Sequence, residues 1–143
     1  MRKTATVFAS ISGCIAVILG ALGAHGLSKC VDSGLISNEI FHAYETAVNY
    51  QLLHSIAMIG IMSLPSKFTM YLKTINYLFI TGIILFSGSI YILVMGDYLK
   101  MNVMWAGPIT PLGGLCLISA WFVLFISTLK YKEEGTANNA QKL

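Results

Sequence analysis

The stretch from Thr4 to Leu27, TATVFASISGCIAVILGALGAHGL, constrains the fold more than any other part of the chain. It contains no Asp, Glu, Lys or Arg, and Arg2 and Lys3 come directly before it. A bilayer core about 30 Å thick needs roughly 20 helical residues at about 1.5 Å each, and this stretch supplies them. Because it is longer than the apolar region of a cleaved signal peptide, about 7–15 residues, we expect it to remain as a membrane helix.

The composition of the whole chain indicates an integral membrane protein. Of its 143 residues, 56% are hydrophobic and only 10% are charged, and the mean hydropathy is +0.74. Soluble domains carry about 25% charged residues, so a soluble fold of this size has too little polar surface. The net charge of +3 comes without a basic stripe interleaved with aromatic residues, so we expect no nucleic-acid partner.

Four apolar segments predict an all-α fold, an integral membrane four-helix bundle. The segments are residues 4–24, 45–64, 74–96 and 110–129. They form a single predicted domain over residues 1–132, followed by a polar tail at 133–143 that we expect to be disordered. The Gly- and Pro-rich residues 107–114 are compatible with either an interfacial turn or a partly re-entrant segment.

The second helix has a recognisable start and end. Ser37 is a suitable N-cap, which predicts that the helix begins near Asn38, outside the hydrocarbon. Pro65 predicts its end, because the residue before a proline disfavours helical geometry.

Basic residues predict the orientation, because Lys and Arg concentrate in short cytoplasmic loops. Seven lie at the ends of the segments on one side: Arg2, Lys3, Lys67, Lys73, Lys130, Lys132 and Lys142. The other side has Lys29 and Lys100. We therefore expect both termini to face the cytoplasm.

Small residues recur along the first segment at helical spacing. The candidate packing positions are Ser12, Ala16, Gly20, Gly23 and Ala24, together with Gly88 in the third segment. In lipid, packing rather than hydrophobicity drives helix association, so small residues indicate close helix contacts. We expect the first helix to be packed centrally in the bundle.

Four polar side chains form a candidate intramembrane site: Gln51 and His54 in the second segment, and Ser87 and Tyr91 in the third. Buried polar groups are costly in lipid unless paired, so they should face the bundle interior. One interpretation is interhelical hydrogen bonding, worth about 0.6 kcal/mol each. The other is a proton, haem or quinone site. One deep histidine with one glutamine does not form a metal cage, so we expect no metal and assign no cofactor.

A second candidate site lies at the outer face, where His25, His42 and Glu45 fall near the ends of the first two segments. We expect the first helix to end at His25, within GAHGL, with its side chain close to the last carbonyls. Glu45 has three candidate partners, His25, His42 and Lys29. Whether the three site residues meet to bind a ligand is left open by the sequence.

Short motifs in a fixed order resemble a known family. They are ISG at 11–13, LGALGAHGL at 19–27, YQ at 50–51 followed by His54, LFSGSIY at 85–91, and TPLGG at 110–114 followed by SAW at 119–121. With this order and spacing, the chain resembles domain of unknown function 423, a family of small four-span membrane proteins. The resemblance implies a multi-pass inner or plasma membrane protein and brings no established activity.

The sequence contains no catalytic triad, phosphate-binding loop or carboxylate pair. We therefore expect a non-enzymatic accessory or scaffold protein that packs with itself or within a larger membrane complex. The alternatives are an oligomeric transporter or channel for a small solute or ion, and a cofactor- or quinone-binding membrane protein.

Overall fold

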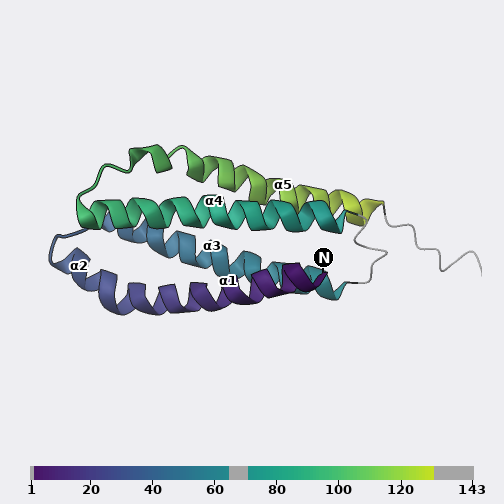
Figure 1. Cartoon of the computed structure of the whole chain (residues 1–143), viewed down its shortest axis with the longest axis horizontal. Coiled ribbons are helices and arrows are strands. Elements are labelled where there is room, and N and C mark those ends of the chain that lie inside the picture. Colours follow the sequence, from purple (N-terminus) through teal and green to yellow (C-terminus); the bar gives the residue numbers. More distant parts are fainter. Residues whose placement is uncertain (1, 65–70, 131–143) are drawn as a thin grey trace, which may run out of the picture.

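The computed structural model describes residues 2–64 and 71–130, and their regular elements are helical. The elements are α1 (Arg2–Leu22), the π-helical turn η1 (Gly23–Leu27), α2 (Ser28–Asp32), α3 (Asn38–Ser63), α4 (Leu72–Leu99), the 3₁₀ turn η3 (Met104–Ala106) and α5 (Ile109–Leu129). The four long helices run along the long axis of the molecule (Figure 1). The predicted all-α bundle is therefore confirmed.

The helices pack in the order of the sequence. In Figure 1, α1 and α5 lie at opposite edges, with α3 and α4 between them. The contacts agree, because α1 packs on α3, α3 on α4, and α4 on α5. The prediction that the first helix is packed centrally is wrong. Its small residues show that a helix comes close, but that helix is mainly α3, and the centre is formed by α3 and α4.

Both ends of α3 are where local sequence signals place them. The Ser37 hydroxyl accepts a hydrogen bond from the Ile40 amide at 3.3 Å and caps the helix, which begins at Asn38. The helix ends at Ser63, and Leu64 is extended immediately before Pro65. The predicted start and end are confirmed.

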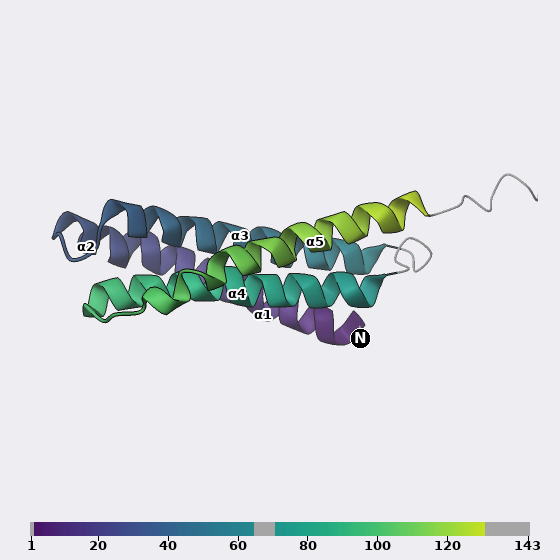
Figure 2. The same ribbon diagram turned by 90° about the horizontal axis from the view of Figure 1, so that it is seen from above.

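The first helix does not end at His25, and that prediction is wrong. The GAHGL motif forms η1, in which the Ser28 amide bonds the Gly23 carbonyl five residues back. The helix then continues as α2, seen at the far end from the N-terminus in Figure 2. A π-turn keeps the backbone hydrogen-bonded while it accommodates an extra residue. The motif that was expected to end the helix therefore forms a wider turn within it.

The entry to α5 is helical. The segment 107–114 follows directly after η3 and contains the first turns of α5, which begins at Ile109. The Thr110 hydroxyl lies 2.7 Å from the Ser89 hydroxyl of α4, which ties the start of α5 to its neighbour.

Glycines set the distance between α4 and α5. A Cβ built at Gly113 would lie 2.7 Å from the Phe86 Cα and closer still to the Phe86 amide nitrogen. A Cβ at Gly82 would lie 2.5 Å from the Leu117 side chain. The two helices therefore approach with backbone against backbone, as small residues allow in membranes.

Three helical stretches in the described ranges are long and apolar enough to cross a membrane: Arg2–Asp32, Leu72–Leu99 and Met104–Leu129. The helix α3 has 26 residues but is not among them. The fourth span and the cytoplasmic orientation of both termini remain predictions. The predicted tail, 133–143, lies outside the described residues.

Candidate functional sites

A buried polar network joins α1, α3 and α4. Gln51, which is 6% exposed, donates from Nε2 to the Ser12 carbonyl at 2.9 Å and accepts at Oε1 from the Tyr91 hydroxyl at 2.7 Å. The Ser55 hydroxyl lies 2.9 Å from the Ser12 hydroxyl and 2.7 Å from the Gln51 carbonyl. The amide of Gln51 is thus paired on both of its polar atoms.

Ser87 makes a second tie between α3 and α4. Its hydroxyl, 1% exposed, donates to the Ala47 carbonyl at 2.8 Å. Because each of these side chains has a partner inside the chain, the desolvation cost of burying it in lipid is offset. The hydrogen bonds of these side chains therefore connect α1, α3 and α4.

His54 lies in a different part of the bundle. Its Nδ1 is 2.7 Å from the Tyr50 carbonyl, and its Nε2 accepts from the Trp121 indole N–H of α5 at 3.2 Å. A carbonyl can only accept, so the proton belongs on Nδ1, and Nε2 is left to accept. This assignment of the neutral tautomer follows from the two partners.

Aromatic rings surround His54. The ring centroids of Phe79 and Tyr50 both lie 5.6 Å from that of His54, and the Trp121 centroid lies at 6.2 Å. A groove of about 790 Å³ opens beside this cluster between α3 and α5. Its lining residues are Tyr50, Leu53, His54, Ile56, Ala57, Phe86, Gly114, Leu117, Ile118 and Trp121.

The groove faces sideways out of the bundle. Leu53, Ile56 and Ile118 line it at mid-helix positions and are 61%, 58% and 66% exposed. In a membrane, these positions face hydrocarbon or another membrane component. A flat apolar molecule would fit such walls, with His54 and Trp121 as the polar groups nearest to it.

The outer-face candidates are only partly brought together. His42 Nδ1 lies 3.0 Å from a Glu45 carboxylate oxygen, and both side chains are exposed, at 74% and 51%. The His25 Nδ1 is instead 3.1 Å from the Ala21 carbonyl one turn back in its own helix. Within residues 2–64 and 71–130, no group of three His, Cys, Asp or Glu side chains could hold a metal ion.

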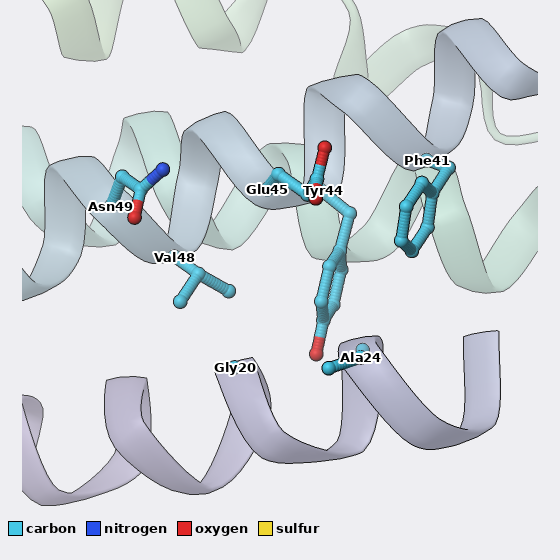
Figure 3. A pocket seen from close by; sticks show the side chains of 8 residues that line it. Gly20, Ala24, Phe41, Tyr44, Glu45, Val48 and Asn49 are labelled. Atoms are coloured by element: carbon cyan, nitrogen blue, oxygen red, sulfur yellow. The ribbon is translucent and has the colours of Figure 1, made fainter. Parts of the chain in front are cut away.

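A small pocket of about 180 Å³ lies between α1 and α3, near the end of the bundle that carries α2 (Figure 3). In Figure 3 the Tyr44 ring reaches from α3 to α1, where its hydroxyl lies beside Ala24. Its hydroxyl donates to the Leu19 carbonyl at 2.6 Å. A Cβ at Gly23 would lie 2.5 Å from the Tyr44 ring, so this glycine makes room for the tyrosine.

The predicted packing residues have different surroundings. Ser12, Ala16 and Gly23 are buried against α3, and a Cβ at Gly20 would lie 3.4 Å from the Val48 side chain. Ala24 is exposed at the pocket rim.

Gly88 does not mark a close helix approach. A Cβ built there meets nothing within 4 Å, because this face of α4 borders an open groove. The close approaches are at Gly82 and Gly113 instead.

Two contributors were missed from the sequence. Trp121 is not among the predicted site residues, although an indole N–H in the middle of an apolar helix signals a hydrogen-bond partner nearby. Asn76 was not singled out, and its signal was a carboxamide within the third apolar segment.

The chain was compared with known protein families and structures. A family model described as protein of unknown function (DUF423) matches residues 19–114. The chain belongs to this family. A DUF423 relative, UPF0382 membrane protein SH2409 of Staphylococcus haemolyticus, is 33% identical over 129 residues, covering 90% of this chain and 98% of its own.

Relatives from two other bacteria are also named as UPF0382 membrane proteins. UPF0382 membrane protein YwdK of Bacillus subtilis is 33% identical over 131 residues, covering 90% of this chain and 98% of the relative. UPF0382 inner membrane protein YgdD of Escherichia coli K12 is 32% identical over 136 residues, covering 92% and 94%. No solved structure gives a significant match. The chain is accordingly a membrane protein of the DUF423 family.

Proposed function

We propose that this DUF423 protein is a non-enzymatic accessory protein that acts within the plane of the membrane by binding another membrane component. The groove between α3 and α5 carries the proposal. It is lined by apolar side chains and opens towards the surrounding lipid at mid-helix depth. A component that approaches laterally through the membrane can reach it directly.

The pairing of the interior polar groups supports the same proposal. Gln51 and Tyr91 bond each other, whereas His54 bonds Trp121 of α5. Ser87 bonds the Ala47 carbonyl, so the four residues of the candidate intramembrane site belong to three separate sets of hydrogen bonds. A transporter or channel formed by an oligomer is the alternative, and it would need a path along other residues.

Site-specific photo-crosslinking in the native membrane tests the accessory role. A photoreactive amino acid replaces Ile118, which is 66% exposed in the groove, and in a matched control it replaces Val17, which is 60% exposed on α1. We expect one defined protein adduct from position 118, either a second copy or a partner, and none of that mass from position 17. Equal labelling at both positions would contradict the proposal.

Flux measurements test the alternative. Liposomes that contain the purified protein should release small ions and solutes no faster than liposomes without protein. Solute flux that the His54→Ala variant abolishes would overturn the accessory role in favour of transport.

A second candidate function is the binding of a lipophilic ring compound of the quinone class in the same groove. The observation that favours it is the lining of the groove, where Tyr50, Phe86 and Trp121 offer aromatic faces beside the hydrogen-bonded nitrogen atoms of His54 and Trp121. Aromatic walls with a few convergent polar groups are typical of small-molecule sites.

Trp121 itself provides the assay. The chain has two tryptophans, so Trp105→Phe leaves Trp121 as the only one. In nanodiscs, a short-chain ubiquinone analogue should quench its fluorescence saturably, and His54→Leu should weaken that quenching. Quenching that rises linearly with the analogue, and equally in His54→Leu, would reflect partition into lipid and exclude this second function.

A further inference from the structure

One buried polar atom at the end of the bundle near the N-terminus lacks a partner. Asn76 of α4 is 4% exposed, and its Nδ2 has only the weak acceptor Met62 Sδ at 3.8 Å. Its Oδ1 has no hydrogen-bond donor among the described residues. An unpaired buried acceptor costs about 1–3 kcal/mol, so a group that donates to it would stabilise the protein.

The Asn76 side chain lines a small pocket between α1 and α4. The pocket measures about 90 Å³, and Thr4, Ala5, Tyr77 and Ile80 complete its lining. A second hollow, of about 340 Å³, follows along the same pair of helices. Its lining residues are Phe8, Ile11, Ser12, Ile15, Leu19, Gln51, Ile83, Ile84, Gly88 and Tyr91.

The two hollows together trace one long groove. On α1 the lining runs from Thr4 to Leu19, which is about 22 Å of helix at about 1.5 Å per residue. One leaflet of the hydrocarbon core is about 15 Å deep, half of the 30 Å total. The groove is therefore long enough for one acyl chain. Gly88 keeps its far part open, because nothing lies within 4 Å of a Cβ built there.

A lysine lies at the mouth of the groove. Lys73 is exposed and lies one turn before Tyr77 on α4, on the face of α4 that lines the small pocket. Positive charge here attracts a phosphate and disfavours the ammonium group of a zwitterionic lipid. The acceptor Asn76 Oδ1 calls for a neutral donor deeper in the pocket, such as a hydroxyl group.

From these features we propose that the α1–α4 groove binds one anionic phospholipid with a hydroxyl-bearing head group, of the phosphatidylglycerol class. A head-group hydroxyl donates to Asn76, the phosphate lies beside Lys73, and an acyl chain occupies the groove past Gly88. This site is on the opposite side of α3 and α4 from the His54 groove, and it stands independently of the accessory role.

Native mass spectrometry tests the site on the full chain. The protein is reconstituted in liposomes of equal parts phosphatidylethanolamine and phosphatidylglycerol and then released in mild detergent. We expect one phosphatidylglycerol per chain to be retained in preference to phosphatidylethanolamine. Asn76→Leu should lower its retention about fivefold or more, as the loss of one hydrogen bond of about 1 kcal/mol implies.

Two glycine variants separate lipid binding from folding. Gly88→Leu fills the groove, whereas Gly60→Leu adds the same side chain on α3, where a Cβ also meets nothing within 4 Å. We expect Gly88→Leu to lose the lipid and Gly60→Leu to retain it, with both eluting as folded protein. Retention of phosphatidylglycerol by Asn76→Leu and Gly88→Leu at the unsubstituted level would overturn the site. Equal retention of both lipids would overturn the assigned head group.

Discussion

Gly113→Ala adds a single methyl group at the closest contact between α4 and α5. The new Cβ would lie 2.7 Å from both the Phe86 Cα and the Leu85 carbonyl carbon. These are backbone atoms of a helix, so no side-chain rotation can relieve the overlap. The helices must separate by about 0.7 Å to bring these two atoms to 3.4 Å, where ordinary van der Waals contact begins, and by more to clear the Phe86 amide nitrogen, which lies closer still.

The cost of that separation follows from the packing it disrupts. A gap of about 0.5–1 Å forfeits a quarter to a half of the dispersion energy of each contact along the interface. Overpacking a filled core costs about 1–3 kcal/mol. Gly114→Ala is the matched control, because its Cβ would meet only the Phe86 ring, at 3.8 Å and 3.9 Å. Both variants gain the same helix propensity, about 1 kcal/mol in water, so it cancels in the comparison.

Thermal unfolding in one mild detergent measures the difference. We expect Gly113→Ala to melt about 3–10 °C below Gly114→Ala, the gap that about 1–3 kcal/mol produces in a chain of this size. Gly114→Ala should match or exceed the unsubstituted protein. Equal melting temperatures for the two variants would refute the argument that backbone contact at Gly113 sets the α4–α5 distance.

Three further predictions use the same melting assay. Tyr91→Phe removes a buried hydroxyl donor and should lower the melting temperature by about 2 °C, since such bonds are worth about 0.6 kcal/mol in membranes. Gly23→Ala, whose Cβ would lie 2.5 Å from the Tyr44 ring, should destabilise the protein, whereas Gly26→Ala, with nothing within 4 Å, should not. In the first turn of α3, hydrogen bonds from its own backbone amide and from the Ser37 cap hydroxyl lower the pKa of the Glu39 carboxyl below its ordinary 4.5. Its charge therefore stabilises the fold above that pH, and the stability is lost as the pH falls through the lowered pKa. A titration of melting temperature from about pH 7 to about pH 3 should show this loss, and Glu39→Gln should reduce it.

The sequence predicted features that depend on local chemistry. The ends of α3 follow from Ser37 and Pro65, because a cap and a proline act on their immediate neighbours. The position of α1 was mispredicted, since a stripe of small residues reports a close neighbour but not how many neighbours there are. Likewise, the pair at Gly113 and Gly114 gives no hint of which glycine meets the Phe86 backbone.

Only part of the arrangement at the candidate intramembrane site could be predicted from the sequence. Gln51 and Tyr91 were placed in one candidate site because both are polar and deep in apolar segments, and they do bond each other. His54 was grouped with them because it follows Gln51 by three residues on one helix. Three residues turn a helix by about 300°, which leaves the two side chains about 60° apart. That angle is enough for His54 to meet Trp121 of α5 while Gln51 faces α1, and only the tertiary packing decides it.

The π-turn at Gly23–Leu27 also sets the rotation of α2 relative to α1 within one continuous helix. It holds one residue more than an α-helical turn would, and every residue of an α-helix adds about 100° of rotation and 1.5 Å of rise. Deleting a single residue from GAHGL would therefore turn α2 by about 100° relative to α1 and draw it about 1.5 Å closer to α1. Lys29 and Cys30 would then face different directions, so the length of this motif, as much as its glycines, determines the direction in which the side chains of α2 point.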